Sequence, residues 1–199
     1  GPINVYNAEP FDNTSFVSSH FTIQDAIDAG TTVNGYFVVV DAGTYAEDIT
    51  ITKELDIRGP NYGINPNTGT RVAEAIIVPA TGGESNSIIS VEASNVKIEG
   101  FTMSGDNPAL TSTFTGTNGA DIDAGIAVNI SVSNIEDMLI TNNIIEDLGY
   151  FGVFMFGSAA SDANTPKTGH EISANLIRNL GYYGTASSLN NWGGGMYLG

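Results

Sequence analysis

The segment ITNNIIEDLGYFG at residues 140–152 returns, 32 residues further along the chain, as ISANLIRNLGYYG at residues 172–184. Seven of the aligned positions are identical, and Asn143 and Asn175 form one of the identical pairs. A weaker copy, VKIEGFTM at residues 96–103, aligns with the first at an offset of 42 residues. Repetition at a regular interval indicates a fold in which one supersecondary unit is stacked on itself.

Each copy reads as short strands in which apolar and polar residues alternate, separated by turns. One coil of three such strands cannot bury its inward side chains by itself. Stacked coils, about 4.8 Å apart, pair their backbones in parallel ladders and join their apolar residues into a continuous interior. The sequence therefore predicts an all-β solenoid with Ile98, Ile140 and Ile172 in one interior column. For Asn143 and Asn175 two interpretations stand: a stacked amide ladder inside the solenoid, or two solvent-facing turn residues.

A short helix is expected near the N-terminus. Thr22 supplies a hydroxyl N-cap, Asp25 follows three residues later, and Gly30 ends the segment. A helix of two turns is not stable alone, so its apolar face must pack against another element. We expect it to cover the open strand edge of the first coil, within an N-terminal cap at residues 20–30 that precedes coils at residues 36–199.

The two ends of the sequence indicate the bounds of the predicted domain. Gly1-Pro2 resembles the remnant of a cleaved tag, so the predicted domain spans residues 3–199. The run GGMYLG at residues 194–199 ends within what reads as a strand, and we expect the parent protein to continue beyond it. The open edge of a truncated last coil would favour self-association.

The composition restricts the class of protein. Apolar residues make up 41% of the chain and charged residues 14%, which favours a folded core and argues against a coiled coil. Six Lys+Arg face 22 Asp+Glu, for a net charge of −16, so the basic surface that nucleic acids require is missing. The chain has no Cys, which excludes disulfides and thiol catalysis. No apolar run is long enough to cross a bilayer, so membrane insertion is not expected.

Three segments carry a resemblance to a known family. They are IQDAIDA at 23–29, VVVDAGTYAEDITI at 38–51 and LDIRG at 55–59. Together they resemble the N-terminal cap and first coil of right-handed parallel β-helix proteins, the pectin-lyase-like superfamily. The resemblance implies a single-stranded, right-handed parallel β-helix with a short N-terminal capping helix. The superfamily includes polysaccharide-degrading enzymes, phage tailspikes and large bacterial surface proteins, so the resemblance specifies fold more closely than function.

Catalytic signatures of that superfamily are not found in this sequence. The segment GTYAE at residues 43–47 is similar to one in pectin methylesterases, but we interpret Gly43 as a turn residue, Tyr45 as packing and Glu47 as outward-facing. The further methylesterase motifs and the polygalacturonase Asp-Asp signature do not occur, and the cations that a uronate lyase needs are scattered. The sequence leaves open whether the chain is an enzyme, although the missing motifs argue against catalysis in this fragment.

Calcium is the cofactor that the acidic residues favour. Asp121 and Asp123 are two residues apart, which on a strand would place them on one face, and Asp106 lies upstream. Ca²⁺ prefers several carboxylate and carbonyl oxygens. The alternative is that these residues are simply solvated in a Gly- and Thr-rich loop.

Aromatic residues gather late in the chain. Tyr182, Tyr183 and Trp192 are candidates for a carbohydrate-binding surface, because sugars stack on exposed aromatic rings. Phe154 and Phe156 are predicted to lie in the core instead. A polysaccharide or a cell-surface glycan is the partner that this interpretation implies.

The leading functional prediction is a non-catalytic β-helix module of a secreted or cell-surface bacterial protein, serving adhesion, glycan binding or as a structural stalk. One alternative is the N-terminal part of a polysaccharide-active enzyme whose catalytic coils lie mostly beyond residue 199. Another is a β-helix assembly protein such as a tailspike or surface-layer component. The acidic surface and the missing catalytic signatures favour the first.

Overall fold

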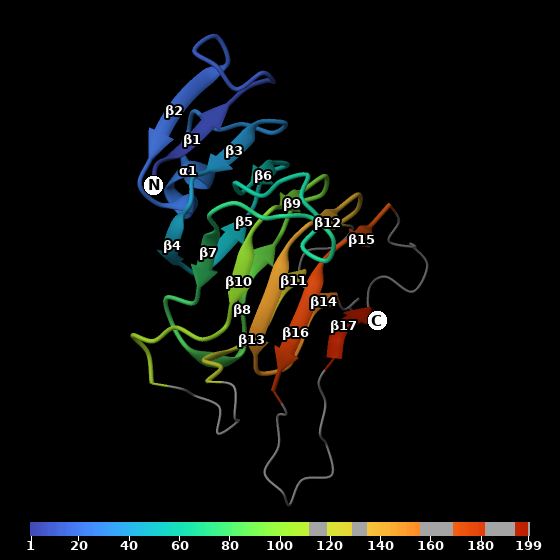
Figure 1. The fold of residues 1–199 in the computed structure, drawn as a ribbon. Helices are drawn as coiled ribbons and strands as arrows, with labels where there is room; N and C mark the ends of the chain where they lie inside the picture. Colours follow the sequence, from blue (N-terminus) through green and yellow to red (C-terminus); the bar gives the residue numbers. More distant parts are fainter. Residues whose placement is uncertain (112–118, 129–134, 156–168, 182–193, 199) are drawn as a thin grey trace, which may run out of the picture.

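The computed structural model describes residues 1–111, 119–128, 135–155, 169–181 and 194–198. The fold is mostly β, as predicted, and the strands from β3 onward fall five to each of three parallel sheets (Figure 1). Sheet A contains β3 (Phe37–Val40), β6 (Asp56–Arg58), β9 (Lys97–Glu99), β12 (Leu139–Thr141) and β15 (Glu171–Ser173). Sheet B contains β4 (Gly43–Ala46), β7 (Ala75–Val78), β10 (Thr102–Ser104), β13 (Ile144–Leu148) and β16 (Leu176–Leu180). Sheet C contains β5 (Ile49–Ile51), β8 (Gly83–Val91), β11 (Ile122–Val128), β14 (Phe151–Met155) and β17 (Gly194–Leu198).

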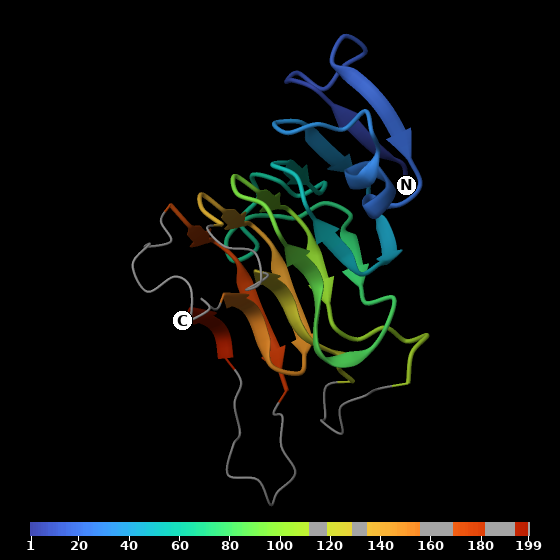
Figure 2. The same cartoon turned by 180° about the vertical axis from the view of Figure 1, so that it is seen from behind.

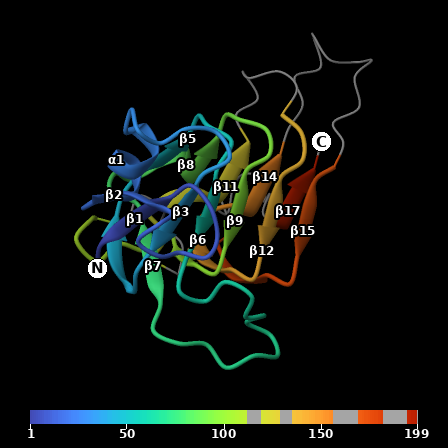
Figure 3. The same cartoon turned by 90° about the horizontal axis from the view of Figure 1, so that it is seen from above.

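The chain visits the sheets in the order A, B, C and then returns to A, so each set of three strands is one coil of a solenoid-like stack. The five coils begin with β3, β6, β9, β12 and β15. The colour sequence in Figures 2 and 3 runs along the stack from the N-terminal to the C-terminal end. Each strand thus pairs with strands one coil away, which satisfies its backbone groups without any hairpin within the coil.

Interior columns form where equivalent residues of successive coils meet. The register of sheet A aligns Val38, Ile57, Ile98, Ile140 and Ile172. The first four are at most 4% exposed, and Ile172, at the end of the column, packs against the same core. The predicted column is therefore confirmed. Burying such side chains contributes roughly 1.5–3 kcal/mol each, which makes the columns the main source of stability.

The N-terminal end of the stack is covered by more than the predicted helix. β1 (Ile3–Tyr6) pairs antiparallel with β3, and β2 (Phe16–His20) pairs antiparallel with β1, so two strands extend sheet A. β1 runs opposite to β3, and β2 runs in the same direction as β3. α1 (Ile23–Asp28) lies across the end of the interior (Figure 3). Its N-cap is Thr22, as predicted. Three apolar residues of the helix are buried: Ile23, Ala26 and Ile27.

Side chains from either side of β5 bind both ends of α1. The Glu47 carboxylate accepts hydrogen bonds from the backbone N–H groups of Ile23 and Gln24, each at 2.9 Å. Lys53 Nζ donates to three carbonyl oxygens at the other end, at 2.7–3.0 Å: those of Ile27, Ala29 and Thr32. The prediction that Glu47 simply faces outward is wrong, because free N–H groups at a helix start attract a carboxylate.

Left-handed backbone conformations recur at the corners between sheets. Between sheets A and B, Gly100, Asn142 and Ala174 have φ of 81°, 55° and 52°. Corresponding positive φ values precede the later strands of sheet A at Asn95, Asp137 and Gly169. Gly100 also needs to lack a side chain, because a Cβ there would collide with the backbone of residues 61 and 62. The same corner geometry is thus rebuilt in the third, fourth and fifth coils, which keeps their columns in register.

Within the described residues, no helix combines the length and the apolar character needed to pass through a bilayer.

Candidate functional site

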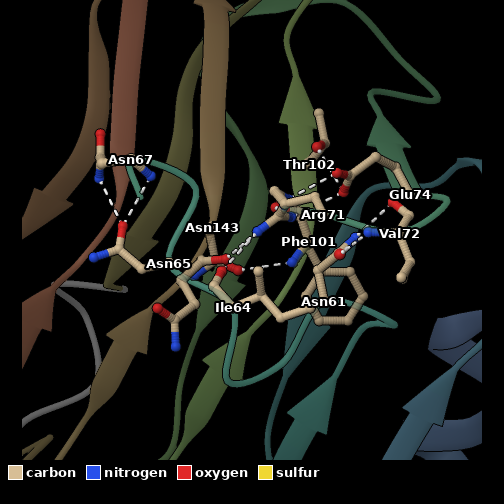
Figure 4. Close-up of polar contacts among 11 residues, drawn as sticks. Asn61, Ile64, Asn65, Asn67, Arg71, Val72, Glu74, Phe101, Thr102 and Asn143 are labelled. Atoms are coloured by element: carbon tan, nitrogen blue, oxygen red, sulfur yellow. Dashed lines mark hydrogen bonds and ion pairs between the residues drawn. The ribbon is translucent and has the colours of Figure 1, made fainter. Parts of the chain in front are cut away.

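A polar cluster lies where the loop at residues 60–74, between β6 and β7, crosses the corner of sheets A and B (Figure 4). Arg71 lies at its centre. Its Nη1 donates to the carbonyl oxygens of Asn142, at 2.8 Å, and Ile64, at 3.3 Å, and its Nη2 donates to that of Phe101 at 3.2 Å. A loop of the second coil is thereby fastened to the third and fourth coils.

The guanidinium of Arg71 is held in place by Glu74. Arg71 Nε donates to Glu74 Oε1 at 2.7 Å and Nη2 donates to Oε2 at 2.8 Å, while the Thr102 hydroxyl donates to Oε2 at 3.1 Å. Burial raises the pKa of Glu74, but the hydrogen bonds and charge of Arg71 outweigh burial and leave that pKa below its ordinary value. The bidentate geometry is the strongest form that such an ion pair takes.

Asn61 closes the base of the same loop. Its Nδ2 donates to the Val72 carbonyl oxygen at 3.2 Å, and its Oδ1 accepts from the Val72 N–H at 2.7 Å. The side chain is fully buried, so these bonds replace the ones that it would make with water. Further along the loop, Asn67 Nδ2 donates to the Asn175 carbonyl oxygen of the fifth coil at 3.3 Å.

Two amides form a ladder beneath this loop. Asn143 is fully buried, and its Oδ1 accepts from the Phe101 N–H at 3.0 Å while its Nδ2 donates to Asn175 Oδ1 at 3.1 Å and to the Ile98 carbonyl oxygen at 2.9 Å. Asn175 repeats the pattern one coil later, with Nδ2 donating to the Ile140 carbonyl oxygen at 2.8 Å. The amide ladder, one of the two interpretations of the repeated Asn, is confirmed.

The chemistry of this cluster is the binding of backbone to side chain. Arg71 donates to the Glu74 carboxylate and to carbonyl oxygens of its own loop and of the third and fourth coils. Asn143 bonds backbone groups of the third coil and the Asn175 amide of the fifth, so both residues bind the coils together. From the sequence, Arg71 was visible only as one of several scattered cations. No spacing rule connects it with Asn142, which lies 71 residues further along the chain.

A second group of side chains lies on the outer face of sheet C. The Phe154 ring stacks on Tyr197 of the next coil, with centroids 5.4 Å apart and an interplanar angle of 21°, and Phe151 lies 5.2 Å from Phe154. The prediction that Phe154 belongs to the core is wrong: Val153 and Met155 point inward, so the alternation of the strand turns Phe154 outward, where it is half-buried. Because β14 is apolar on both of its faces, its sequence does not show which side chains point inward.

The other aromatic candidates cannot be placed. Tyr182, Tyr183 and Trp192, predicted to bind carbohydrate, and Phe156, predicted to lie in the core, fall outside the described residues. In the sequence, Trp192 comes two residues before Gly194, which pairs with Phe151.

The acidic candidates lie around the start of β11. Asp121 is fully buried, whereas Asp106 and Asp123 are half-buried. Asp121 lies directly before β11 and Asp123 lies within it, on either side of the buried Ile122 in the sequence. Burial raises the pKa of Asp106, and the nearby carboxylates of Asp121 and Asp147 raise it further. Over the described ranges, no three acidic or histidine side chains are already arranged to hold a metal ion.

Comparison with known proteins adds a distant relative. No family model matches the chain, and no solved structure matches it. The chain is 29% identical over 141 residues to a cell surface glycoprotein of Methanothermus fervidus. The aligned region covers 70% of this chain and 18% of the glycoprotein, so the chain spans less than a fifth of that relative.

Proposed function

We propose that this chain is a non-catalytic module of a cell-surface protein, built as a right-handed parallel β-helix of the pectin-lyase-like type. Its role is that of a rigid stalk within a longer protein. The likeness to a cell surface glycoprotein supports the location, and the acidic composition suits an exposed, soluble surface.

The observation that best supports a stalk role is that the polar side chains at the A–B corner bond backbone groups of the coils. Arg71, Asn61 and Asn143 bind backbone groups, and the single side chain of Arg71 connects the second coil to both the third and the fourth. A catalytic site instead needs polar groups directed at a substrate. Cross-links between coils stiffen a stack in which each coil otherwise contacts only its neighbours, and stiffness is the property that a stalk requires.

Activity assays test the non-catalytic role against the leading alternative, the N-terminal part of a polysaccharide-active enzyme. The protein is incubated with a panel of neutral and acidic polysaccharides, and release of reducing ends and of unsaturated products is followed. We expect no turnover above that of heat-denatured protein. Clear turnover of any polysaccharide would overturn the proposal and favour the enzyme.

Glycan binding is a second candidate function, favoured by the aromatic group on sheet C. Phe151, Phe154 and Tyr197 lie on an outer face, and aromatic rings are frequent contacts in ligand sites. Tyr182, Tyr183 and Trp192 extend this candidate along the sequence. A glycan array with and without Ca²⁺ tests it, using Phe154→Ala and Trp192→Ala variants and Phe16→Ala as a control. Phe16 is 46% exposed on β2, at the other end of the molecule. Glycan binding that survives both variants would exclude this surface.

A further inference from the structure

Asp121, directly before β11, is a fully buried carboxylate with an incomplete set of partners. Its Oδ2 accepts one hydrogen bond, from the backbone N–H of Asn107 at 2.8 Å. Its Oδ1 is buried and has no hydrogen-bond partner among the described residues. An ionised carboxylate has about four acceptor sites. Removing such a group from water costs several kcal/mol unless a cation or further donors compensate for it.

A second carboxylate lies beside the first. The Asp121 N–H donates to the Gly105 carbonyl oxygen at 2.8 Å, so the segment at residues 105–107 runs against the start of β11. The Asp106 carboxylate lies over the backbone of Gly119, where a Cβ would come within 2.8 Å of Asp106 Oδ2. The segments that bear the two carboxylates are thus held against each other, although like charges repel.

A neighbouring carboxylate shows what satisfied partners look like here. Asp147 Oδ2 accepts from the Ser104 hydroxyl at 3.3 Å, and its Oδ1 contacts the Asn179 amide nitrogen. Asp147 therefore has polar partners for both oxygens. Asp121 Oδ1, by contrast, has no such partner among the described residues.

We propose that Asp121 and Asp106 bind one Ca²⁺ ion, which joins the segment at residues 105–107 to the segment at residues 119–121. Main-chain carbonyl oxygens and water complete the coordination, as Ca²⁺ accepts six to eight oxygen ligands in flexible geometry. Mg²⁺ fits less well because it demands a nearly ideal octahedron, and zinc prefers His and Cys ligands. Asp123 is not part of the proposed pair. The ion goes beyond the stalk role, which does not depend on it.

Calorimetry and thermal unfolding test this site with Ca²⁺ and Mg²⁺ as the probes. We expect the protein to bind Ca²⁺ and its melting temperature to rise by about 5 °C in millimolar Ca²⁺ relative to EDTA. Asp121→Asn should lose at least about tenfold in Ca²⁺ affinity and most of that rise. Without Ca²⁺ the same variant should be no less stable than the original protein, since it removes a buried charge.

Two controls keep the result decisive. Asp28→Asn removes an exposed carboxylate of α1 and should bind Ca²⁺ as the original protein does. Asp106→Asn provides a second ligand variant if Asp121→Asn does not fold. Absence of Ca²⁺ binding by the original protein would overturn the proposal, and so would unchanged affinity in the two ligand variants. An equal rise in melting temperature with Mg²⁺ would show only general screening of the −16 net charge, and it would also overturn the proposal.

Discussion

At the scale of single residues, Arg71 illustrates how one side chain stabilises several coils. It is part-buried, and its five N–H donors are distributed between the Glu74 carboxylate, one carbonyl oxygen of its own loop and one carbonyl oxygen from each of two other coils. The ion pair with Glu74 fixes the plane of the guanidinium. In that orientation the Nη atoms of Arg71 lie within hydrogen-bonding distance of the carbonyl oxygens. Glu74 therefore acts as the positioning group, and its charge state should control how firmly the loop is attached.

Glu74→Gln tests this through pH. The folded-state pKa of Glu74 lies below its unfolded value, so its ionised form contributes stability above a pH of about 4.3 that is lost as the pH falls through the folded pKa. We expect the variant to be about 1–2 kcal/mol less stable at pH 7, and we expect this difference to shrink as the pH falls toward 3. Urea unfolding at both pH values measures the difference. Asp28→Asn, at an exposed site, should change stability by less than about 0.5 kcal/mol at either pH. A difference for Glu74→Gln that did not shrink in acid would contradict the argument.

At the scale of elements, the A–B corner is one turn built repeatedly from different residues. Gly100 and Asn142 are residue types that tolerate a positive φ, but Ala174 adopts the same conformation with φ of 52°. An L-residue other than Gly or Asn in this region costs roughly 1 kcal/mol. The fifth coil therefore carries strain that its equivalents in the third and fourth coils avoid.

Ala174→Gly should stabilise the protein by about 0.5–1 kcal/mol, because it removes this strain. The matched control is Ala73→Gly, at an exposed loop position that has no positive φ. There the only effect is the added freedom of the unfolded chain, so the control should be slightly destabilising. Thermal and urea unfolding measure both. Two variants that change stability in the same direction would show that the corner is not strained.

The short helix α1 depends on its tertiary partners, because a helix of 6 residues has more free end groups than internal hydrogen bonds. Lys53→Met keeps the apolar stem but removes three hydrogen bonds to the helix end and the turn after it. We expect a loss of about 1–2 kcal/mol and faster hydrogen exchange in residues 23–32. Lys97→Met, at a side chain that is 51% exposed, should have little effect. Unaltered exchange in α1 would show that its packing alone holds it.

The sequence predicted the repeated strands and the short helix, and it missed the two strands that occur once. The 32-residue offset was enough to pair Ile140 with Ile172 and Asn143 with Asn175, because equal positions in successive coils meet the same surroundings. β1 and β2 were missed since they occur once, run antiparallel and have no copy to align with. The contacts of Arg71 could not be derived, because the path of a long loop is set by the surface that it meets and not by its own pattern.

At the scale of the whole molecule, the two ends of the stack differ. The N-terminal end is covered by α1, β1 and β2, whereas β15, β16 and β17 are each the last described strand of their sheet. Met196 and Leu198 pair in register with the inward-facing Val153 and Met155, yet they are 49% and 63% exposed. Strand edges with apolar side chains at their ends are where chains add to one another. A further layer of strands would bury Met196 and Leu198 and so extend the two columns that contain Val153 and Met155.

We therefore expect this chain to self-associate through the end that carries β15, β16 and β17. Sedimentation velocity over a range of concentrations should show a reversible dimer whose fraction falls in Leu198→Lys, because burying a charge between two such ends is costly. Phe21→Lys is the matched control: Phe21 is 93% exposed and lies next to α1 at the covered end. If association used any exposed apolar residue, the two variants would reduce it equally. If association used the strand edges, only Leu198→Lys would reduce it. A chain that stayed monomeric at every concentration would show that this end does not associate.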